Sequence, residues 1–199
     1  MTPSTWIVNN RAMNLNIPNI LTLCRIALLP VLVFVFYMPE FNNQHVVLAS
    51  LFFIIGITDW FDGYLARKLN QQSAFGAFLD PVADKLTVSI VLVLLVSTHP
   101  GFLMALPAAI IIGREITISA LREWMANIGH NSEVKVSLIG KFKTAGQLWA
   151  IGFLLYEQPI GWFSPLQFGY LLLYISATLT LWSMVSYLIA AWPSLNREG

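Results

Sequence analysis

The chain has 199 residues, of which 57% are hydrophobic and only 11% charged, and its mean hydropathy is +0.68. Soluble domains carry about 25% charged residues, so this composition excludes an ordinary soluble protein and predicts an integral membrane protein. The formal net charge of +1 indicates no particular partner, and we expect no nucleic acid to bind. The single cysteine, Cys24, excludes an internal disulfide.

Residues 1–15 are too short and too polar to span a bilayer. We expect them to lie along the membrane interface as an amphipathic helix, with a disordered tail as the alternative. The apolar run that begins near Ile17 does not resemble a cleaved signal peptide. It is too long, it contains Arg25, and it lacks a small-residue cleavage site.

The rest of the chain divides into apolar segments separated by polar or proline-containing breaks. Six of them reach the ~20 residues that a bilayer-spanning helix needs, at about 17–38, 44–68, 79–98, 102–126, 137–157 and 166–191. We therefore expect an all-α integral membrane protein with six transmembrane helices. Residues 1–199 are expected to form a single domain.

The basic residues predict the orientation in the membrane. With a cytoplasmic N-terminus, the connections at 39–43, 99–101 and 158–165 face outwards, and they contain no Lys or Arg. All eleven basic residues then fall in the cytoplasmic half, as the positive-inside rule requires: Arg11, Arg25, Arg67, Lys68, Lys85, Arg114, Arg122, Lys135, Lys141, Lys143 and Arg197. We expect a bacterial cytoplasmic membrane protein with both termini, and its polar residues, on the cytoplasmic side.

Four aspartates gather at the junction of the second and third segments. Asp59 and Asp62 are spaced i, i+3, and Asp80 and Asp84 are spaced i, i+4, so each pair shares one face of a helix. Four carboxylates in one cluster cannot all stay ionised without cations between them. Hard oxygen ligands suit Mg²⁺ or Mn²⁺, and we expect two such ions. The alternative is salt bridging of the aspartates with Arg67 and Lys85. The histidines share no spacing that suggests metal binding.

The fixed positions of this stretch read Asp59-x-x-Asp62-Gly63-x-x-Ala66-Arg67, then eight residues, then Gly76-x-x-x-Asp80-x-x-x-Asp84. This pattern resembles, at every fixed position, the signature of the CDP-alcohol phosphotransferases, which are membrane enzymes that join an alcohol to a phosphatidyl group and release CMP. The resemblance implies that Asp59, Asp62, Asp80 and Asp84 are metal ligands, and that Asp84 is also the general base. It further implies contacts to the cytidine diphosphate from Asn19, Thr22, Gly63, Arg67 and Ser73. For Asn19 and Thr22, helix–helix hydrogen bonding is the alternative.

Residues 111–125 and 134–147 are similar to the phosphatidylglycerophosphate synthase branch of that family. The cations of this region suit an anionic acceptor such as glycerol 3-phosphate, and we expect them to hold its phosphate: Arg114, Lys135, Lys141 and Lys143. The loop lysines have an alternative role, in binding anionic lipid headgroups or setting topology. Pairing of Arg114 with Glu115, or of Arg122 with Glu123, would weaken the assignment.

The resemblance thus implies an enzyme that transfers the phosphatidyl group of CDP-diacylglycerol to glycerol 3-phosphate, giving phosphatidylglycerophosphate and CMP. It also implies a homodimer surrounded by membrane lipids. A sibling enzyme using serine, inositol phosphate or phosphatidylglycerol as acceptor is the nearest alternative. A divalent-cation transporter is a more distant one, because transport needs polar groups across the membrane depth and the outer half of these segments is apolar.

Overall fold

The computed structural model describes residues 17–68, 74–127 and 138–195, and these residues form six α-helices. Their bounds are α1 Ile17–Tyr37, α2 Gln44–Lys68, α3 Ala74–Thr98, α4 Phe102–Asn127, α5 Leu138–Tyr156 and α6 Pro165–Leu195. The all-α class and the six predicted helical segments are confirmed. The predicted interfacial segment 1–15 lies outside the described residues.

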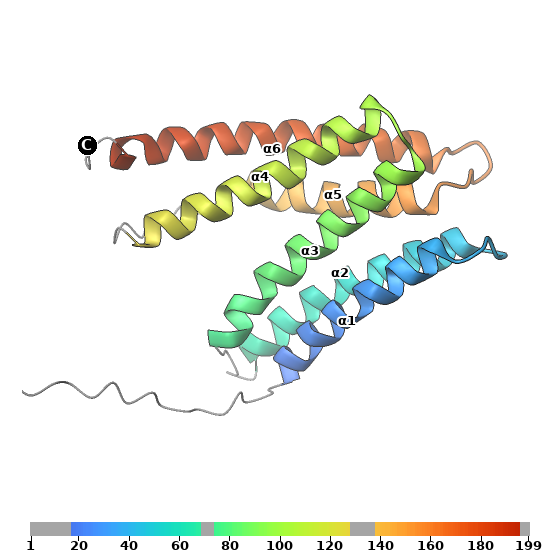
Figure 1. Ribbon diagram of the computed structural model, residues 1–199, viewed down its shortest axis with the longest axis horizontal. Helices are drawn as coiled ribbons and strands as arrows, with labels where there is room; N and C mark the ends of the chain where they lie inside the picture. The colour runs from blue at the N-terminus through green and yellow to red at the C-terminus, as the bar shows by residue number, and fades with distance from the viewer. Residues whose placement is uncertain (1–16, 69–73, 128–137, 196–199) are drawn as a thin grey trace, which may run out of the picture.

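The three described connections, α1–α2, α3–α4 and α5–α6, lie together at one end of the molecule (Figure 1). The tightest of them is the turn between α3 and α4, where Gly101 has a φ of 141°. Residues with a side chain rarely adopt that conformation, so glycine suits this turn. The opposite end holds the C-termini of α2, α4 and α6 and the start of α3 (Figure 1). This is the end at which the sequence places the aspartates.

The predicted membrane-spanning segment 79–98 is part of a longer helix, because α3 begins at Ala74. Hydropathy marks where a continuous apolar run begins, whereas helix formation extends further, through Phe75, Gly76 and Ala77. Pro81 consequently lies inside the helix and not in its first turn. Proline has no N–H, so it cannot donate the usual hydrogen bond to the carbonyl four residues earlier.

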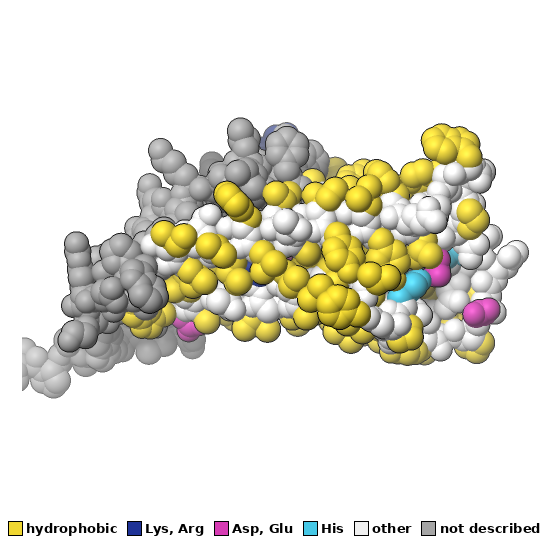
Figure 2. Space-filling view, turned by 90° about the horizontal axis from the view of Figure 1, so that it is seen from above, with side chains coloured by type: hydrophobic (Ala, Val, Ile, Leu, Met, Phe, Trp, Pro, Cys, Tyr) yellow, Lys and Arg dark blue, Asp and Glu magenta, His cyan; other side chains and the backbone are white. Residues whose placement is uncertain are grey.

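The interior is built from large apolar side chains contributed by all six helices. Those with no measurable exposure include Leu32, Phe52, Val91, Met104, Ile111, Ile151 and Leu173. Many other large apolar side chains are exposed, among them Phe34, Val93, Trp182 and Ile189. Hydrophobic side chains dominate the middle of the face drawn in Figure 2, histidine side chains lie towards one end, and acidic side chains lie towards both ends. Helices that are apolar on their outer as well as inner faces are typical of a membrane protein.

Three of the helices are long and apolar enough to cross a membrane, as judged from the described residues. These stretches are Asn19–Tyr37, Phe102–Met125 and Pro165–Ile189, whereas α2 contributes a shorter apolar stretch, Gln44–Asp59. The charges of Asp80, Asp84 and Lys85 lie within the first half of α3. The structure therefore supports a membrane protein with three candidate spans.

Candidate active site between helices α1, α2 and α3

The N-terminal half of α1 has a polar buried face. Asn19, Thr22 and Arg25 recur every three residues and are each no more than 3% exposed, whereas the intervening Ile20 and Leu23 are exposed. The spacing puts the three polar residues on one side of the helix. Helix α1 packs against both α2 and α3, while α2 and α3 make few contacts with each other. Buried polar groups require hydrogen-bond partners, and those of α1 find them on the two neighbouring helices.

Arg25 joins the other two helices through one nitrogen. Its Nη1 donates to Oδ1 of Asp59 on α2 at 2.7 Å and to Oδ1 of Asp84 on α3 at 2.8 Å. Those two oxygens are therefore no more than 5.5 Å apart, because both bonds share the same nitrogen. Oγ1 of Thr22 donates to Oδ1 of Asp80 at 2.7 Å. Helix α1 thus contacts three of the four predicted aspartates.

The ionised groups differ in their access to solvent. The Arg25 side chain is 1% exposed, whereas those of Asp59 and Asp84 are 42% and 54% exposed. The guanidinium therefore lies on the protein side of the two carboxylates, which keep an open side. The proposed alternative partner Lys85 forms no ion pair with any acid in the described part of the chain. The described cluster contains the carboxylates of Asp59, Asp80 and Asp84 but one guanidinium, so negative charge is in excess.

This donor set fits a divalent cation. The ligands are carboxylate oxygens in excess of the neighbouring positive charge, which is the chemistry that Mg²⁺ and Mn²⁺ prefer. Within the described side chains no group of three His, Cys, Asp or Glu is close enough to hold a metal ion alone. The fourth predicted ligand, Asp62, lies on α2, but its side chain is outside the described set. Asp59, Asp80 and Asp84 are the described residues that can contribute.

The predicted nucleotide contacts fall partly outside the described residues. Gly63 and Arg67 lie on α2, but their side-chain positions are not among those described, and Ser73 lies between the described ranges. Asn19 and Thr22 are described and buried. The bond from Thr22 to Asp80 joins α1 to α3, which is the helix–helix hydrogen bonding that was the alternative for this position.

Arg114 lies against α6. Its Nη1 donates to Oε1 of Glu115 at 2.9 Å and its Nη2 to Oγ of Ser183 at 3.3 Å, while its guanidinium lies 5.9 Å from the centre of the Tyr187 ring. The pairing with Glu115 is the one that weakens an acceptor role. Arg122 contacts Tyr187 and not Glu123, with Nη2 at 3.5 Å from the phenol oxygen. Lys135 and the side chains of Lys141 and Lys143 lie outside the described set.

Sequence reasoning missed the role of Arg25. It appeared there as one of eleven basic residues, although it is the largest side chain that the described fold buries almost completely. The sequence did contain a signal. An arginine in an apolar helix raises the free energy of the folded protein unless it is paired, and Arg25 lies three residues after Thr22, on the same face of the helix. The sequence did not show which residues pair with Arg25, since Asp59 and Asp84 are 34 and 59 residues away.

A cavity of about 190 Å³ opens beside the carboxylates. Arg25, Asp59 and Asp84 line one part of it, and apolar side chains such as Phe52 and Leu148 line the rest. Pockets for drug-sized ligands span about 300–1,000 Å³, so this cavity has room for only part of a large substrate. Its α5 residues include the buried Gln147.

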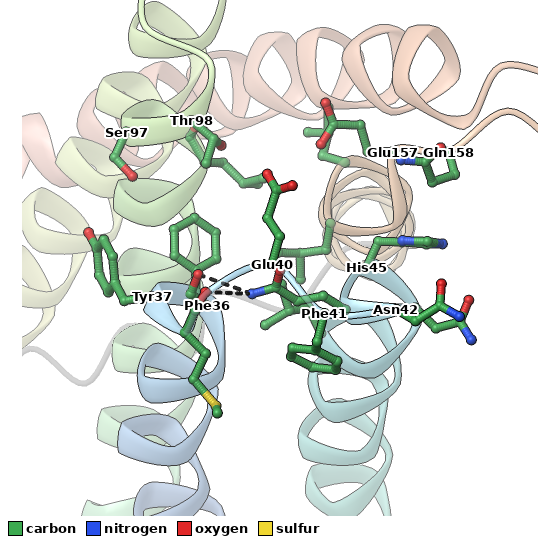
Figure 3. Close-up of a pocket in the computed structure, with 17 residues that line it drawn as sticks. Phe36, Tyr37, Glu40, Phe41, Asn42, His45, Ser97, Thr98, Glu157 and Gln158 are labelled. Carbon is green, nitrogen blue, oxygen red and sulfur yellow. Dashed lines mark hydrogen bonds between the residues drawn. The ribbon is translucent and has the colours of Figure 1, made fainter.

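A larger cavity, of about 800 Å³, lies at the opposite end of the molecule. Figure 3 shows Glu40, His45, Glu157 and Gln158 around it, where the α1–α2 connection meets the ends of α3 and α5. Gln44 closes the connection by donating from Nε2 to the carbonyl oxygen of Val35 at 2.8 Å. None of the four predicted aspartates lines this cavity.

Comparison with known proteins identifies the family of the chain that carries this aspartate cluster. Residues 15–182 match the family described as CDP-alcohol phosphatidyltransferase. The chain belongs to this family. CDP-alcohol phosphatidyltransferases are enzymes, and the family match includes α1 to α5 together with every predicted aspartate.

Members of the family with known names are similar along nearly their whole length. A protein of Pseudomonas fluorescens is 49% identical over 93% of this chain and 94% of its own length. A protein of Salmonella choleraesuis strain SC-B67 is 52% identical over 90% and 96%, and one of Shigella flexneri serotype 5b is 50% identical over 92% and 98%. All three are named CDP-diacylglycerol–glycerol-3-phosphate 3-phosphatidyltransferase. The predicted family and branch are confirmed.

Proposed function

We propose that this protein transfers the phosphatidyl group of CDP-diacylglycerol to glycerol 3-phosphate. The C1 hydroxyl oxygen of glycerol 3-phosphate forms a bond to the phosphorus that carries the diacylglycerol. The pyrophosphate P–O bond breaks, and CMP leaves with its electron pair. The products are phosphatidylglycerophosphate and CMP, and the proton of the hydroxyl passes to a carboxylate of the site.

The observation that carries the proposal is the set of aspartates held by α1, in a chain about half identical to three named enzymes of this activity. Carboxylates that are open on one side and gathered from two helices are suited to hold cations. Cations in turn are suited to hold a pyrophosphate. A merely structural ion pair would not need three acids for one guanidinium.

Asp59, Asp62, Asp80 and Asp84 would hold two divalent cations, Mg²⁺ or Mn²⁺. When bound, the cations supply positive charge that stabilises the attacking and leaving oxygens of an in-line displacement. The protein holds the carboxylates in place from the buried side, through Arg25 and Thr22. Asp84, whose side chain is half exposed, takes the proton from the glycerol hydroxyl, a role typically worth about 10²–10⁴-fold in rate.

The remaining residues are proposed to bind the cytidine diphosphate of one substrate and the phosphate of the other. Asn19, Thr22, Gly63, Arg67 and Ser73 are proposed to surround the cytidine diphosphate. Arg114, Lys135, Lys141 and Lys143 are proposed to hold the phosphate of the acceptor. Of these four cations Arg114 is described, and its pairing with Glu115 means that acceptor binding would have to exchange that partner for phosphate.

The proposed setting is the bacterial cytoplasmic membrane, crossed by all six helices, with the aspartates facing the cytoplasm. The apolar outer surface and the collection of three connections at the opposite end support this arrangement. A homodimer is proposed from family resemblance. CMP and glycerol 3-phosphate are water-soluble, so an active site at the aqueous end of the helices is accessible to both.

The test is the incubation of purified protein with CDP-diacylglycerol, Mg²⁺ or Mn²⁺ and one alcohol at a time. Release of CMP and identification of the lipid product by mass spectrometry give the answer. We expect phosphatidylglycerophosphate with glycerol 3-phosphate, and no comparable turnover with serine, inositol phosphate or phosphatidylglycerol. Faster CMP release with another alcohol would assign the chain to a sibling activity. Metal uptake into vesicles without CMP release would favour a transporter.

A further inference from the structure

Arg25 carries a permanent charge into an apolar part of the protein. It is 1% exposed, and it is the single charged residue of α1. A buried charge is costly unless it is paired and hydrogen-bonded. Arg25 pairs with Asp59 and Asp84, which are metal ligands under the proposed function. Its role therefore extends beyond helix packing. The inference below rests on that proposed function.

The two bonds of Arg25 link helices that have little other contact at this point. Asp59 is on α2 and Asp84 on α3, and these helices touch each other far less than each touches α1. Two carboxylates with oxygens at most 5.5 Å apart, as the bonds of 2.7 and 2.8 Å require, repel each other. A cation on their buried side counteracts that repulsion, so Arg25 sets the distance between them.

Arg25 also leaves room for a second cation. The two bonds described above use Oδ1 of each carboxylate, and in the described part of the chain Asp59 bonds through Oδ1 alone. Both carboxylates are about half exposed, whereas the Arg25 side chain is buried. A divalent ion can therefore approach from the open side without displacing Arg25.

We propose that Arg25 is the positioning residue of the metal site, holding Asp59 and Asp84 at the separation that a divalent cation requires. Electrostatics alone gives the opposite expectation. A guanidinium beside a metal site repels the metal ion, so removing it would tighten metal binding. If Arg25 positions the ligands, its removal weakens metal binding instead. The two explanations therefore predict opposite changes in metal affinity when Arg25 is removed.

The experiment is a titration of Mn²⁺ into purified protein in lipid nanodiscs without either substrate, with free Mn²⁺ followed by electron paramagnetic resonance. Residues that orient metal ligands typically change metal affinity by about 10–100-fold, and we expect Arg25→Gln to weaken Mn²⁺ binding by that factor. Arg25→Lys keeps the charge and a single donor nitrogen, so its affinity should lie between those of Arg25→Gln and the wild type. An unchanged or higher Mn²⁺ affinity in Arg25→Gln would overturn the proposal.

Lys85→Gln is the matched control, because it removes a positive charge next to Asp84 without removing a described bond to a carboxylate. It should leave Mn²⁺ affinity unchanged or raise it. A loss as large as that of Arg25→Gln would show that the weaker binding does not depend on the bonds between Arg25 and the carboxylates, against the proposal. If Arg25→Gln does not fold, Arg25→Lys decides, since it preserves the buried charge. Wild-type affinity in that variant would then overturn the positioning role.

This result is independent of the substrates. If wild-type protein releases no CMP with glycerol 3-phosphate, the proposed function fails, but the Mn²⁺ titrations still report whether Arg25 positions the carboxylates. If wild-type protein is active and Arg25→Gln binds Mn²⁺ normally, the positioning role alone fails. The two failures are therefore distinguishable.

Discussion

The polar chemistry of this protein is concentrated in a few side chains at one end of α1, α2 and α3. Arg25 and Thr22 supply hydrogen-bond donors from the buried side, and Asp59, Asp80 and Asp84 supply acceptors with an open side. The consequences can be tested one residue at a time. The substitutions of polar residues described next each change one side chain.

Removal of a proposed metal ligand should abolish turnover. In Asp59→Ala, Asp62→Ala or Asp80→Ala the cation loses a ligand, so we expect CMP release at ordinary Mg²⁺ to fall to the detection limit. Asp84→Asn should also stop turnover while both substrates still bind, which equilibrium binding of the two substrates would detect. Near-normal activity in any one alanine variant would remove that residue from the ligand set.

Substitution of Thr22 can distinguish two roles of its hydroxyl. The hydroxyl bonds to Asp80 at 2.7 Å, and it was also predicted to contact the nucleotide. Thr22→Val keeps the shape and removes the bond. A hydrogen bond to a charged group is worth about 1.5–3 kcal/mol, so kcat should fall about 10–100-fold with little change in the KM for CDP-diacylglycerol. Thr22→Ser keeps the hydroxyl and should stay near wild type. A rise in that KM alone would assign Thr22 to the nucleotide.

Arg114 tests the acceptor site. Lysine cannot reproduce the two-pronged hydrogen bonding of arginine to phosphate, so Arg114→Lys should lower kcat/KM for glycerol 3-phosphate by about 10–100-fold. The KM for CDP-diacylglycerol should stay close to wild type in a two-substrate kinetic series. Ser183→Ala is the control, because it removes the hydrogen bond from Arg114 to α6 and leaves the arginine. An equal loss in that control would make the role of Arg114 structural.

Among the helices, α1 connects α2 to α3, and α5 packs closely against α6. Gly169 on α6 accounts for part of the close packing of α5 against α6. A Cβ at this position would lie 2.8 Å from Cγ of Leu154 and 3.1 Å from the backbone oxygen of Ala150 on α5. Small residues at such positions let membrane helices approach each other.

Gly169→Ala should therefore destabilise the protein. Overpacking costs about 1–3 kcal/mol, which exceeds the gain of up to about 1 kcal/mol from better helix propensity. Thermal unfolding in detergent should show a lower Tm. Gly113→Ala on α4 is the matched control, since a Cβ there meets nothing within 4 Å, and its Tm should be unchanged or higher. An unchanged Tm in Gly169→Ala would contradict the close packing of α5 and α6.

For the whole molecule, the separation of its two ends implies an orientation in the membrane. The end with three connections carries the acids Glu40 and Glu157 and the larger cavity. His99 and Glu157 lie together there, with Nε2 at 3.2 Å from Oε1, and link the α3–α4 turn to the end of α5. None of these three connections contains Lys or Arg.

Cysteine labelling tests this orientation. In a Cys24→Ala background, a membrane-impermeant thiol reagent added to intact cells should modify a cysteine placed at His99 and not one placed at Gln71. The expectation follows from the exclusion of Lys and Arg from the outer connections. The labelling of both sites in lysed cells is the control for reactivity. The reverse pattern would contradict the proposed topology.

The sequence by itself determined the class, the six helices and the aspartate motif, because these depend on local chemistry. Long apolar runs form helices, and breaks such as His99–Gly101 end them. The i, i+3 and i, i+4 spacings place the acids on helix faces wherever those helices pack. Hydropathy was less reliable at the start of α3, where Ala74 begins the helix before the apolar run.

Only the tertiary structure decided which residues meet across helices. Sequence proximity offered Arg67 and Lys85 as the alternative partners of the aspartates, whereas Asp59 and Asp84 bond to Arg25. Arg114 bonds across to Ser183 on α6 as well as to its neighbour Glu115. Periodicity defines which face of a helix is polar, but not which other helix that face meets. Apolar helices in a membrane can be packed in many orders that bury similar surfaces. The partner of Arg25 was therefore decided by the packing of α1 between α2 and α3, which brings together residues 34 and 59 positions apart.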